Sequence, residues 1–449
     1  MLRWVSGLAT IIFTGCAPQS SLKPQGPLVG GGIRFQETSA QFQSNSVWWR
    51  TFSDATLSRE IDNALRNNLS QKQFSARIRQ ASASLRGEGA ALFPQLDLNT
   101  TSSLDSASGN SSKTASFGEL LSWELDVFGR TRSGIAAQQS ELEATIQDSL
   151  GGRLLLTAAV AETRFLTLEQ RARLKILNDQ MRTNETLLDL VRLRVGQGIS
   201  SRVDLLQQER QLDATRALIP AAEAELAASE YALDVLTGRA PGTRPRDDRS
   251  TLPSLPGKPG AGVPSDLLKN RPDLLAQWNR ILALDARAGQ ALADRFPRFV
   301  IGASLDAGSL RSINSIASTI LAEVTAPLTD GGARQAEIDR TRASLEEALL
   351  GYSNTYLEAI RDVETALVRE RKQAERIRLT DRQLATARAT LDETRSRYSE
   401  GLTDYLPVID ALAATQSLEL STLALRREAL TLRVALHRAL GGPMPLTKP

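Results

Sequence analysis

Cysteine and histidine are almost absent from this chain, which contains one of each among its 449 residues. A single Cys excludes a disulfide within the chain, and one Cys with one His cannot complete a zinc site or a Cys–His–Asp catalytic array. An enzyme built on carboxylates is still compatible with the composition, but no motif points to one. We therefore expect no catalytic residues, no metal site and no cofactor.

Aromatic side chains are also scarce, and the net charge is small. Phe, Trp and Tyr make up 5% of the chain, and 54 basic residues against 51 acidic ones leave a net charge of +3. Because the charges are interspersed at helical spacing and form no basic block, we expect no nucleic-acid binding. The hydrophobic content of 41% permits folding, and the length allows two or three cores.

A long hydrophobic run is missing as well. Val5 to Phe13 is apolar but too short for a permanent membrane-spanning helix, and it leads into Thr14-Gly15-Cys16. This pattern resembles a bacterial lipoprotein signal, with residues 1–15 removed and a lipid anchor on Cys16 in the outer membrane. An ordinary signal peptide with an incidental Cys is the alternative. Residues 16–56, rich at first in Ser, Gln, Gly and Pro, are expected to form a tether and N-terminal segment.

Two adjacent tryptophans, Trp48 and Trp49, stand where the polar tether ends. Such a pair is typical either of packing against the first helix or of a docking patch at the surface. We expect packing.

An internal repeat governs the rest of the sequence. The stretch around Gly198 aligns without gaps to the stretch around Gly401, 203 positions later, and landmarks from the Phe-Pro pairs to the final glycines keep that offset. The offset predicts a first structural repeat at 57–238, a linker at 239–264, a second repeat at 265–441 and a tail at 442–449.

Each repeat is expected to contain a helix, a β-hairpin, a long helix, a break and a returning helix. The hairpins are predicted at 94–128 and 297–329, and residues 105–114 of the first hairpin are expected to form a polar loop. The predicted helices are Leu57–Leu92, Thr131–Val195 and Ser201–Leu236 in the first copy, and Ser265–Arg295, a matching long helix and Tyr405–Leu440 in the second.

The predicted strands alternate apolar and polar residues, as in Leu96-Asp97-Leu98-Asn99. Strands of about ten residues with one apolar face suit a transmembrane barrel with a wet lumen, although a soluble amphipathic hairpin would show the same pattern. Four strands cannot close a barrel, and an open edge in hydrocarbon leaves backbone groups unpaired. A cyclic trimer with about twelve strands would satisfy both conditions.

The long helices carry heptad seams that require a partner helix. The first seam consists of Leu174, Leu177, Met181, Asn184, Leu188, Val191 and Val195. Asn184 is the polar member and is a candidate for fixing the register. The matching seam of the second copy is weaker, which predicts a firmer first coil and a more mobile second one.

Several short stretches, taken together with the repeat, resemble a known family. They are Phe13-Thr14-Gly15-Cys16, Trp48-Trp49, Phe93-Pro94, Phe296-Pro297, the segment from Ser122 to Arg130, and the segment from Arg397 to Leu402. The chain resembles the TolC-like outer membrane factors, and among them the NodT- and OprM-like lipoproteins that serve RND-type multidrug efflux systems. This resemblance implies an α+β membrane protein: a homotrimer with a 12-stranded outer-membrane β-barrel on an α-helical coiled-coil periplasmic barrel.

The resemblance also implies a function and partners. Such proteins are passive exit ducts for small toxic compounds, and they work with a periplasmic adaptor protein and an inner-membrane RND-type pump. Two alternatives stay open: the exit duct of a one-step (type I) protein secretion system, and a structural outer-membrane lipoprotein without transport function.

The family gate implies specific residues in this chain. Tyr398 and Asp204 correspond to a tyrosine–aspartate hydrogen bond between the two coils, Asp410 to a ring of carboxylates at the constriction, and Arg397 to the same aperture. Thr403 replaces a gating Arg, and Pro407 stands where a second ring Asp is common. The alternative is that both aspartates are solvated helix residues and Tyr398 belongs to the core.

The helix turns are the predicted contact surface for the adaptor protein. They contain Gly198, Ile199 and Ser200 in the first copy, and Gly401, Leu402 and Thr403 in the second.

Overall fold

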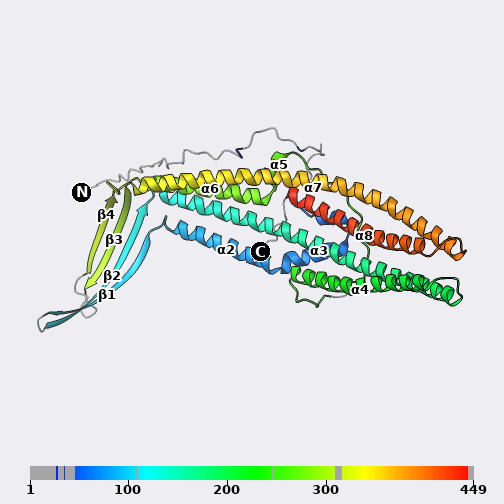
Figure 1. The fold of residues 1–449 in the computed structure, drawn as a ribbon. Helices are drawn as coiled ribbons and strands as arrows, with labels where there is room; N and C mark the ends of the chain where they lie inside the picture. The colour runs from blue at the N-terminus through cyan, green and yellow to red at the C-terminus, as the bar shows by residue number, and fades with distance from the viewer. Residues whose placement is uncertain are drawn as a thin grey trace. The chain divides into compact units, whose positions relative to one another are not determined.

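The computed structural model describes residues 27–28, 35, 46–107, 110–244, 247–308 and 316–442. Cys16, most of the predicted tether and the tail beyond residue 442 lie outside these described residues. In chain order the described elements are η1 (Trp48–Phe52), α1 (Ala55–Asn67), α2 (Leu69–Ala90), β1 (Gln95–Ala107), β2 (Asn110–Leu125), α3 (Arg130–Gly196), α4 (Arg202–Leu236), α5 (Pro264–Asn270), α6 (Pro272–Ala293), β3 (Arg298–Gly308), β4 (Ile316–Thr325), α7 (Ala333–Ser399) and α8 (Leu406–Leu440). Figure 1 shows them coloured along the chain.

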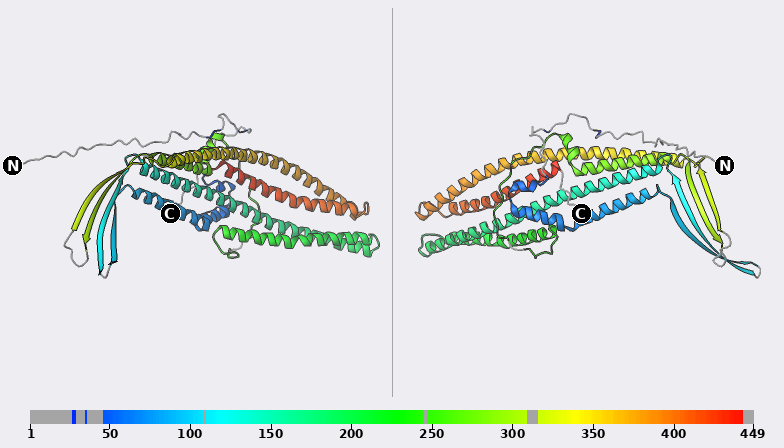
Figure 2. Two further views of the ribbon diagram at one scale, coloured as in Figure 1. Left: turned by 60° about the vertical axis from the view of Figure 1, so that its left-hand side comes forward. Right: turned by 180° about the vertical axis from the view of Figure 1, so that it is seen from behind.

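The element bounds confirm the internal duplication. α3 and α7 each contain 67 residues, and α4 and α8 each contain 35. α2 begins at Leu69 and α6 at Pro272, while α3 begins at Arg130 and α7 at Ala333, so these two second-copy helices begin 203 positions after their counterparts. In each copy the long helix and the returning helix run side by side (Figure 2). We call these pairs coil 1 (α3 with α4) and coil 2 (α7 with α8).

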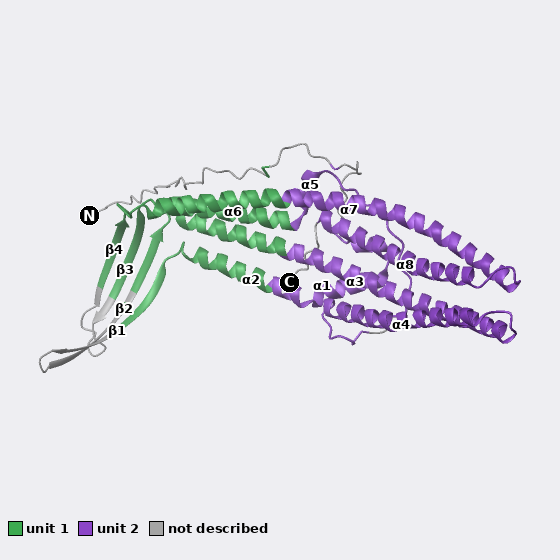
Figure 3. Ribbon diagram, in the orientation of Figure 1, with its two compact units in different colours: residues 1–30, 76–148, 273–355 green, residues 31–75, 149–272, 356–449 purple. Residues whose placement is uncertain are grey.

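The chain divides into two compact units (Figure 3). Unit 1 contains the β-sheet, nearly all of α6 and parts of α2, α3 and α7, and it comprises residues 1–30, 76–148 and 273–355. Unit 2 contains α1, α4, α5, α8 and the rest of the long helices, and it comprises residues 31–75, 149–272 and 356–449.

The sheet of unit 1 is antiparallel throughout, in the order β1-β2-β3-β4. Leu96 is opposite Leu121, Leu121 is opposite Ala303, and Ala303 is opposite Ile320, so these four residues lie in one row on one face. Ile320 is 85% exposed within the chain, and Leu96 is 66% exposed. The apolar face predicted from the alternation is therefore confirmed, and Leu96 and Ile320 on the two outer strands are left largely uncovered by the described chain.

The first hairpin is longer than predicted. Residues 105–114 were expected to form a polar loop, but β1 continues to Ala107 and β2 begins at Asn110. The loop contains no proline, and its Ser and Thr residues are compatible with extended backbone, so nothing in the sequence ends the ladder earlier.

Two predicted helices are each broken in two. The helix expected from Leu57 to Leu92 ends at Asn67, because Asn68 is extended and caps α2: its Oδ1 accepts from the N–H of Ser70 at 2.9 Å. The helix expected from Ser265 to Arg295 is interrupted at Arg271, which precedes a proline and is therefore extended.

A core of unit 2 forms around the N-terminal tryptophans. Trp48 is 3% exposed and Trp49 is 1% exposed, and both pack with Phe52, Phe165 and residues of α1, α3 and α8. The packing interpretation of this pair is confirmed. His437 on α8 stacks on Trp48, with ring centroids 5.3 Å apart.

This stack predicts loss of stability in acid. Burial, together with the positive charge of Arg433, lowers the pKa of His437 to about 4. An unfolded chain binds this proton below pH ~6.5, so the stabilising contribution is complete above pH ~6.5 and is lost as the pH falls toward 4. We expect a loss of about 1 to 3 kcal/mol per chain over that range. Thermal unfolding midpoints followed by circular dichroism at pH 7, 5.5 and 4 will show a smaller loss for His437→Phe than for the wild type. Equal losses for both proteins would contradict this account.

We predict that any side chain at Gly238, just after α4, lowers the stability of the protein. Its φ is +74°, and a Cβ there would lie 2.6 Å from the carbonyl oxygen of Asn67. Gly198 provides a matched control, because its φ is +73° but no described atom lies within 4 Å of its Cβ position. Gly198→Ala should cost about 1 kcal/mol from the left-handed backbone alone. Gly238→Ala should cost about 2 kcal/mol more, because backbone must also move. Thermal unfolding in detergent measures the difference, and similar midpoints for the two variants would refute it.

The linker between the copies contains no helix or strand among its described residues before α5. Its first part contacts α3, where Asp247 forms an ion pair at 2.6 Å with Arg164, which is fully buried. Its second part contacts α8, where the guanidinium of Arg433 donates to the carbonyl oxygens of Pro256 and Gly257.

None of the helices that the structure describes is both long enough and apolar enough to cross a lipid bilayer.

Candidate functional site

The two helix turns of unit 2 have the same backbone structure. After α3, the N–H of Ile199 donates to the carbonyl oxygen of Arg194 at 2.9 Å, and Gly198 has a φ of +73°. After α7, the N–H of Leu402 donates to Arg397 at 2.8 Å, and Gly401 has a φ of +77°. Both are the Schellman type of helix end, in which glycine takes the left-handed position. The repeated glycines of the sequence therefore build the same turn twice.

The helices that follow the turns begin differently. Ser201 and Asp204 form a reciprocal capping box: the Ser201 hydroxyl accepts from the N–H of Asp204 at 3.2 Å, and the Asp204 carboxylate accepts from the N–H of Ser201 at 3.0 Å. α8 has no side-chain cap, and Pro407 lies in its first turn. Asp204 therefore stabilises the start of α4.

Tyr398, at the end of α7, lies between the two coils and is 4% exposed. Its hydroxyl forms a 2.7 Å hydrogen bond with the Ser200 hydroxyl of the first turn. The guanidinium of Arg194 on α3 lies 4.4 Å from the centre of the Tyr398 ring and donates to the carbonyl oxygen of Ser399 at 3.4 Å. Coil 1 thus contacts Tyr398 through a hydroxyl and a cation.

These contacts correct two expectations. The predicted hydrogen bond between Tyr398 and Asp204 is absent from the described structure, because Asp204 caps its own helix and Ser200 takes its place. Arg397, expected at the aperture, is exposed, and its guanidinium forms no hydrogen bond or ion pair with any described residue. Its counterpart in the first copy, Arg194, contacts Tyr398 instead.

Tyr405, immediately before α8, forms the second contact between the coils. It is 1% exposed, and its hydroxyl donates to Oε1 of Gln208 on α4. Burial, with smaller contributions from Tyr398 and Asp204, raises the pKa of Tyr405, so the hydroxyl stays protonated and remains a donor. The rings of Tyr398 and Tyr405 lie 5.2 Å apart, in a buried cluster that includes Val191 of α3.

The remaining predicted residues lie at the surface. Ile199 is 59% exposed and Leu402 is 64% exposed, so each turn presents an apolar side chain at the surface of the chain. Thr403 is half-buried. Asp410 on α8 is exposed and has no polar partner among the described residues.

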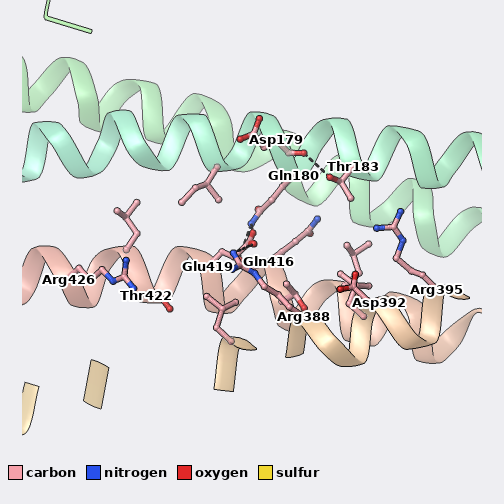
Figure 4. Close-up of a pocket in the computed structure, with 16 residues that line it drawn as sticks. Asp179, Gln180, Thr183, Arg388, Asp392, Arg395, Gln416, Glu419, Thr422 and Arg426 are labelled. Carbon is pink, nitrogen blue, oxygen red and sulfur yellow. Dashed lines mark hydrogen bonds and ion pairs between the residues drawn. The ribbon is translucent and has the colours of Figure 1, made fainter. Parts of the chain in front are cut away.

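A cavity of about 650 Å³ lies beside these contacts, between α3 and coil 2 (Figure 4). Its lining mixes charges of both signs, including Asp179, Asp392, Glu419, Arg388 and Arg395. Within the described ranges, no group of three or more His, Cys, Asp or Glu side chains is placed to hold a metal ion.

Four of the contact residues were not assigned to the gate from the sequence. Ser200 was assigned to the adaptor contact, Tyr405 only to the start of the last helix, and Arg194 and Gln208 were not singled out. Gln208 carried a usable signal, because it is a polar residue on the heptad seam of α4, between Leu205 and Leu212.

The described chain is thus a duplicated coiled-coil hairpin with two β-hairpins, and its two helix turns are in contact. A sequence profile of the outer membrane efflux protein family matches residues 61–239 and 263–442. The chain belongs to this family.

Individual relatives cover nearly the whole chain. The cation efflux system protein CusC of Escherichia coli strain K12 is 27% identical over 434 residues, which cover 95% of this chain and 93% of CusC. The pyoverdine export outer membrane protein OpmQ of Pseudomonas putida is 27% identical over 421 residues, covering 90% of each chain. The solved structure of the outer-membrane channel OprN is similar with a TM-score of 0.85 and 25% identity, over 93% of this chain and 99% of OprN.

Proposed function

We propose that this protein is the outer membrane channel of a tripartite efflux system, a passive exit duct for small toxic compounds. It would act with a periplasmic adaptor protein and an inner-membrane RND-type pump. The observation that carries the proposal is the four-stranded sheet, which is joined to two coiled coils and has one exposed apolar face. Membership of the outer membrane efflux protein family supports it.

The sheet supports a homotrimer. β1 and β4 are its edges, and neither pairs with a further strand among the described residues. Unpaired edge groups are too costly in hydrocarbon, so each edge requires the opposite edge of another copy. Three copies related by a threefold axis would close a barrel of about twelve strands, with the row containing Leu96 and Ile320 toward lipid.

The contacts at the helix turns support a gate. The Tyr398–Ser200 and Tyr405–Gln208 hydrogen bonds join coil 2 to coil 1, and each contributes about 0.5 to 1.5 kcal/mol net. Repeated in three copies, such bonds hold a closed arrangement but are weak enough for a docking adaptor to release. The exposed Ile199 and Leu402, with Gly198, Ser200, Gly401 and Thr403 beside them, are the surface we assign to adaptor contact.

The names of the relatives bear on the transported compound. CusC is named for cations, and OpmQ for pyoverdine. The two names give different cargo to relatives of one family, which suits a duct whose pump selects the substrate. For this chain, a lipid on Cys16 would add an anchor in the outer membrane.

The experiment that tests the proposal begins with the full-length protein expressed in a Gram-negative host and extracted from outer membranes with detergent. We expect a heat-modifiable trimer that gives discrete conductance steps in planar bilayers, and adaptor and RND-type pump subunits that co-purify with it. A trimer without conductance would favour a structural lipoprotein. Co-purification with a protein-exporting ATPase system would favour type I secretion.

A further inference from the structure

Four arginines line one cavity where the end of α5 meets α7 and α8, within unit 2. The cavity has a volume of about 550 Å³, and its charged lining residues are Arg271, Arg361, Arg369, Arg438 and Asp362. Four positive charges against one negative charge leave +3 on the described lining, and the rest of that lining is uncharged. We call this space the arginine cavity. Like charges held this close repel one another unless an anion is bound between them.

Two of the four guanidiniums share the one carboxylate. Arg361 on α7 forms an ion pair with Asp362 at 3.0 Å. Arg271, whose side chain is 13% exposed, lies 3.7 Å from the same carboxylate. It also donates to the carbonyl oxygen of Ala439 on α8 at 3.2 Å. Asp362 therefore compensates at most one of these two positive charges.

The other two guanidiniums are available to a ligand. Arg369 on α7 and Arg438 on α8 are both exposed, and neither guanidinium forms a hydrogen bond or an ion pair with a described residue. Glu162 on α3 is near enough to Arg438 to interact with its charge, but it does not line the cavity. The donors of two arginines thus face a space that contains no acceptor for them among the described residues.

The first copy of the repeat shows that the fold does not require these charges. The positions 203 residues before the four arginines are uncharged: they are Asn68, Ala158, Leu166 and Val235. The helices around them have the same lengths in both copies. The arginine cavity is therefore a feature of the second copy alone, which helix packing does not explain.

Asn68 and Arg271 show the difference between the copies most directly. Nδ2 of Asn68 donates to the carbonyl oxygen of Leu236 at 3.0 Å, and Nη1 of Arg271 donates to the carbonyl oxygen of Ala439 at 3.2 Å. Leu236 and Ala439 are also 203 positions apart, so the two hydrogen bonds are equivalent. Arginine keeps the contact with the returning helix that asparagine makes, and it adds a positive charge to the cavity.

The lining selects the kind of anion. A guanidinium presents N–H donors in a planar fork, which matches the oxygens of a carboxylate or a phosphate. A carboxylate has two oxygens and one negative charge, whereas a phosphate group carries about −1.5 to −2 at pH 7 on three oxygens. Phosphate groups therefore compensate the net charge of the lining more completely. The volume is within the ~300 to 1,000 Å³ of small-molecule sites, so the ligand can be larger than a bare ion.

We propose that the arginine cavity is a binding site for phosphate-bearing anions, and that two phosphate groups suit it best. Arg369 and Arg438 provide the unpaired donors, and Arg271 adds a mostly buried charge. A bound anion joins α7 to α8 where the guanidiniums otherwise repel one another. The source of the phosphate is either a soluble compound or the headgroup of a lipid. The site does not depend on the channel function, because binding requires no conduction.

Isothermal titration calorimetry of the full-length trimer in an uncharged detergent tests the site, with pyrophosphate as the ligand. We expect saturable binding to the wild type at constant ionic strength. The double variant Arg369→Gln, Arg438→Gln should bind at least about tenfold more weakly, because two charge-assisted contacts are lost. Pyrophosphate should also raise the thermal unfolding midpoint of the wild type more than that of this variant. If the double variant forms no trimers, Arg438→Gln alone should still weaken binding.

The double variant Arg376→Gln, Arg382→Gln is the matched control. Both are exposed arginines of α7 that do not line the cavity, and their replacement removes the same two charges. The control should bind pyrophosphate as the wild type does. Equal losses in the two double variants would show a response to net charge only and would overturn the proposal. A wild-type trimer that binds no pyrophosphate would also overturn it, since a neighbouring copy would then supply the missing negative charge.

A competition experiment identifies the source of the phosphate once binding is shown. Phosphatidylglycerol is added to the detergent micelles, with phosphatidylcholine as the lipid of no net charge. Weaker pyrophosphate binding with phosphatidylglycerol alone would support the site and assign it to anionic lipid headgroups. Unchanged binding with both lipids would support the site and assign it to soluble phosphate compounds. Conductance does not enter either measurement, so a trimer without channel activity would refute the proposed function and leave this test intact.

Discussion

The double variant Tyr398→Phe, Tyr405→Phe will conduct ions without an adaptor, with an open fraction at least about a hundredfold above wild type. Both rings are retained, so the buried cluster with Val191 keeps its packing. The hydrogen bonds to Ser200 and Gln208 are lost, and Gln208 is left with a buried, unsatisfied oxygen. At about 0.5 to 1.5 kcal/mol each, six lost bonds in a trimer exceed the roughly 3 kcal/mol that a hundredfold shift requires.

Single-channel recording with purified trimers measures this effect. The matched control is Tyr356→Phe, which removes a hydroxyl from another tyrosine of α7, 6% exposed, that is remote in sequence from both turns. The control should behave as wild type. Asp204→Ala should lower stability slightly through the lost cap and leave the conductance unchanged. A double variant that stays closed would contradict this account of the gate. An Asp204→Ala variant that opens would instead support the tyrosine–aspartate hydrogen bond that the family resemblance implies.

Much of the fold could be predicted from the sequence because the duplication supplies each element twice. The constant offset placed α3 and α7 correctly, and strand parity placed Leu96 and Ile320 on one face. The break at Asn68 could not be predicted from periodicity. An asparagine in a helical pattern can either continue the helix or cap a new one, and here a tertiary contact accompanies the cap: its Nδ2 donates to the carbonyl oxygen of Leu236 on α4.

The contacts between the coils, which we assign to the gate, were harder to predict, because the repeat supplies two equivalent positions for such a residue. Arg194 and Arg397 occupy the same place in the two copies, and only the packing of coil 1 on coil 2 decides which of them contacts Tyr398. Ser200 and Asp204 present a different ambiguity, because both are polar residues of the first copy near the turn, only four positions apart. Local sequence identified Asn184 as the polar seam residue, but its partner Gln416 lies 232 positions away.

Asp410 is expected to control which ions pass the channel. It is exposed on α8 although Ile409 and Ala411 on either side are buried, so its carboxylate points away from the chain's own contacts. No described residue neutralises it. In a trimer whose coil 2 helices surround the axis, three such carboxylates would attract cations and repel anions at the narrowest part. Asp410→Asn should weaken the cation preference, and Asp410→Lys should reverse it, changing the permeability ratio at least about tenfold.

Reversal potentials measured in a salt gradient across a planar bilayer give this ratio directly. Asp213→Lys is the matched control, because Asp213 is an exposed aspartate of α4 that forms only a surface ion pair at 3.6 Å with Arg216. The control should keep the wild-type selectivity, since a charge on the outside of coil 1 is screened over about 10 Å in 0.1 M salt. Because the change adds the same charge in both variants, a difference between them reports position and not net charge. Identical reversal potentials for Asp410→Lys and the wild type would place Asp410 away from the conduction path, and the constriction would then have to be formed by other residues of coil 2.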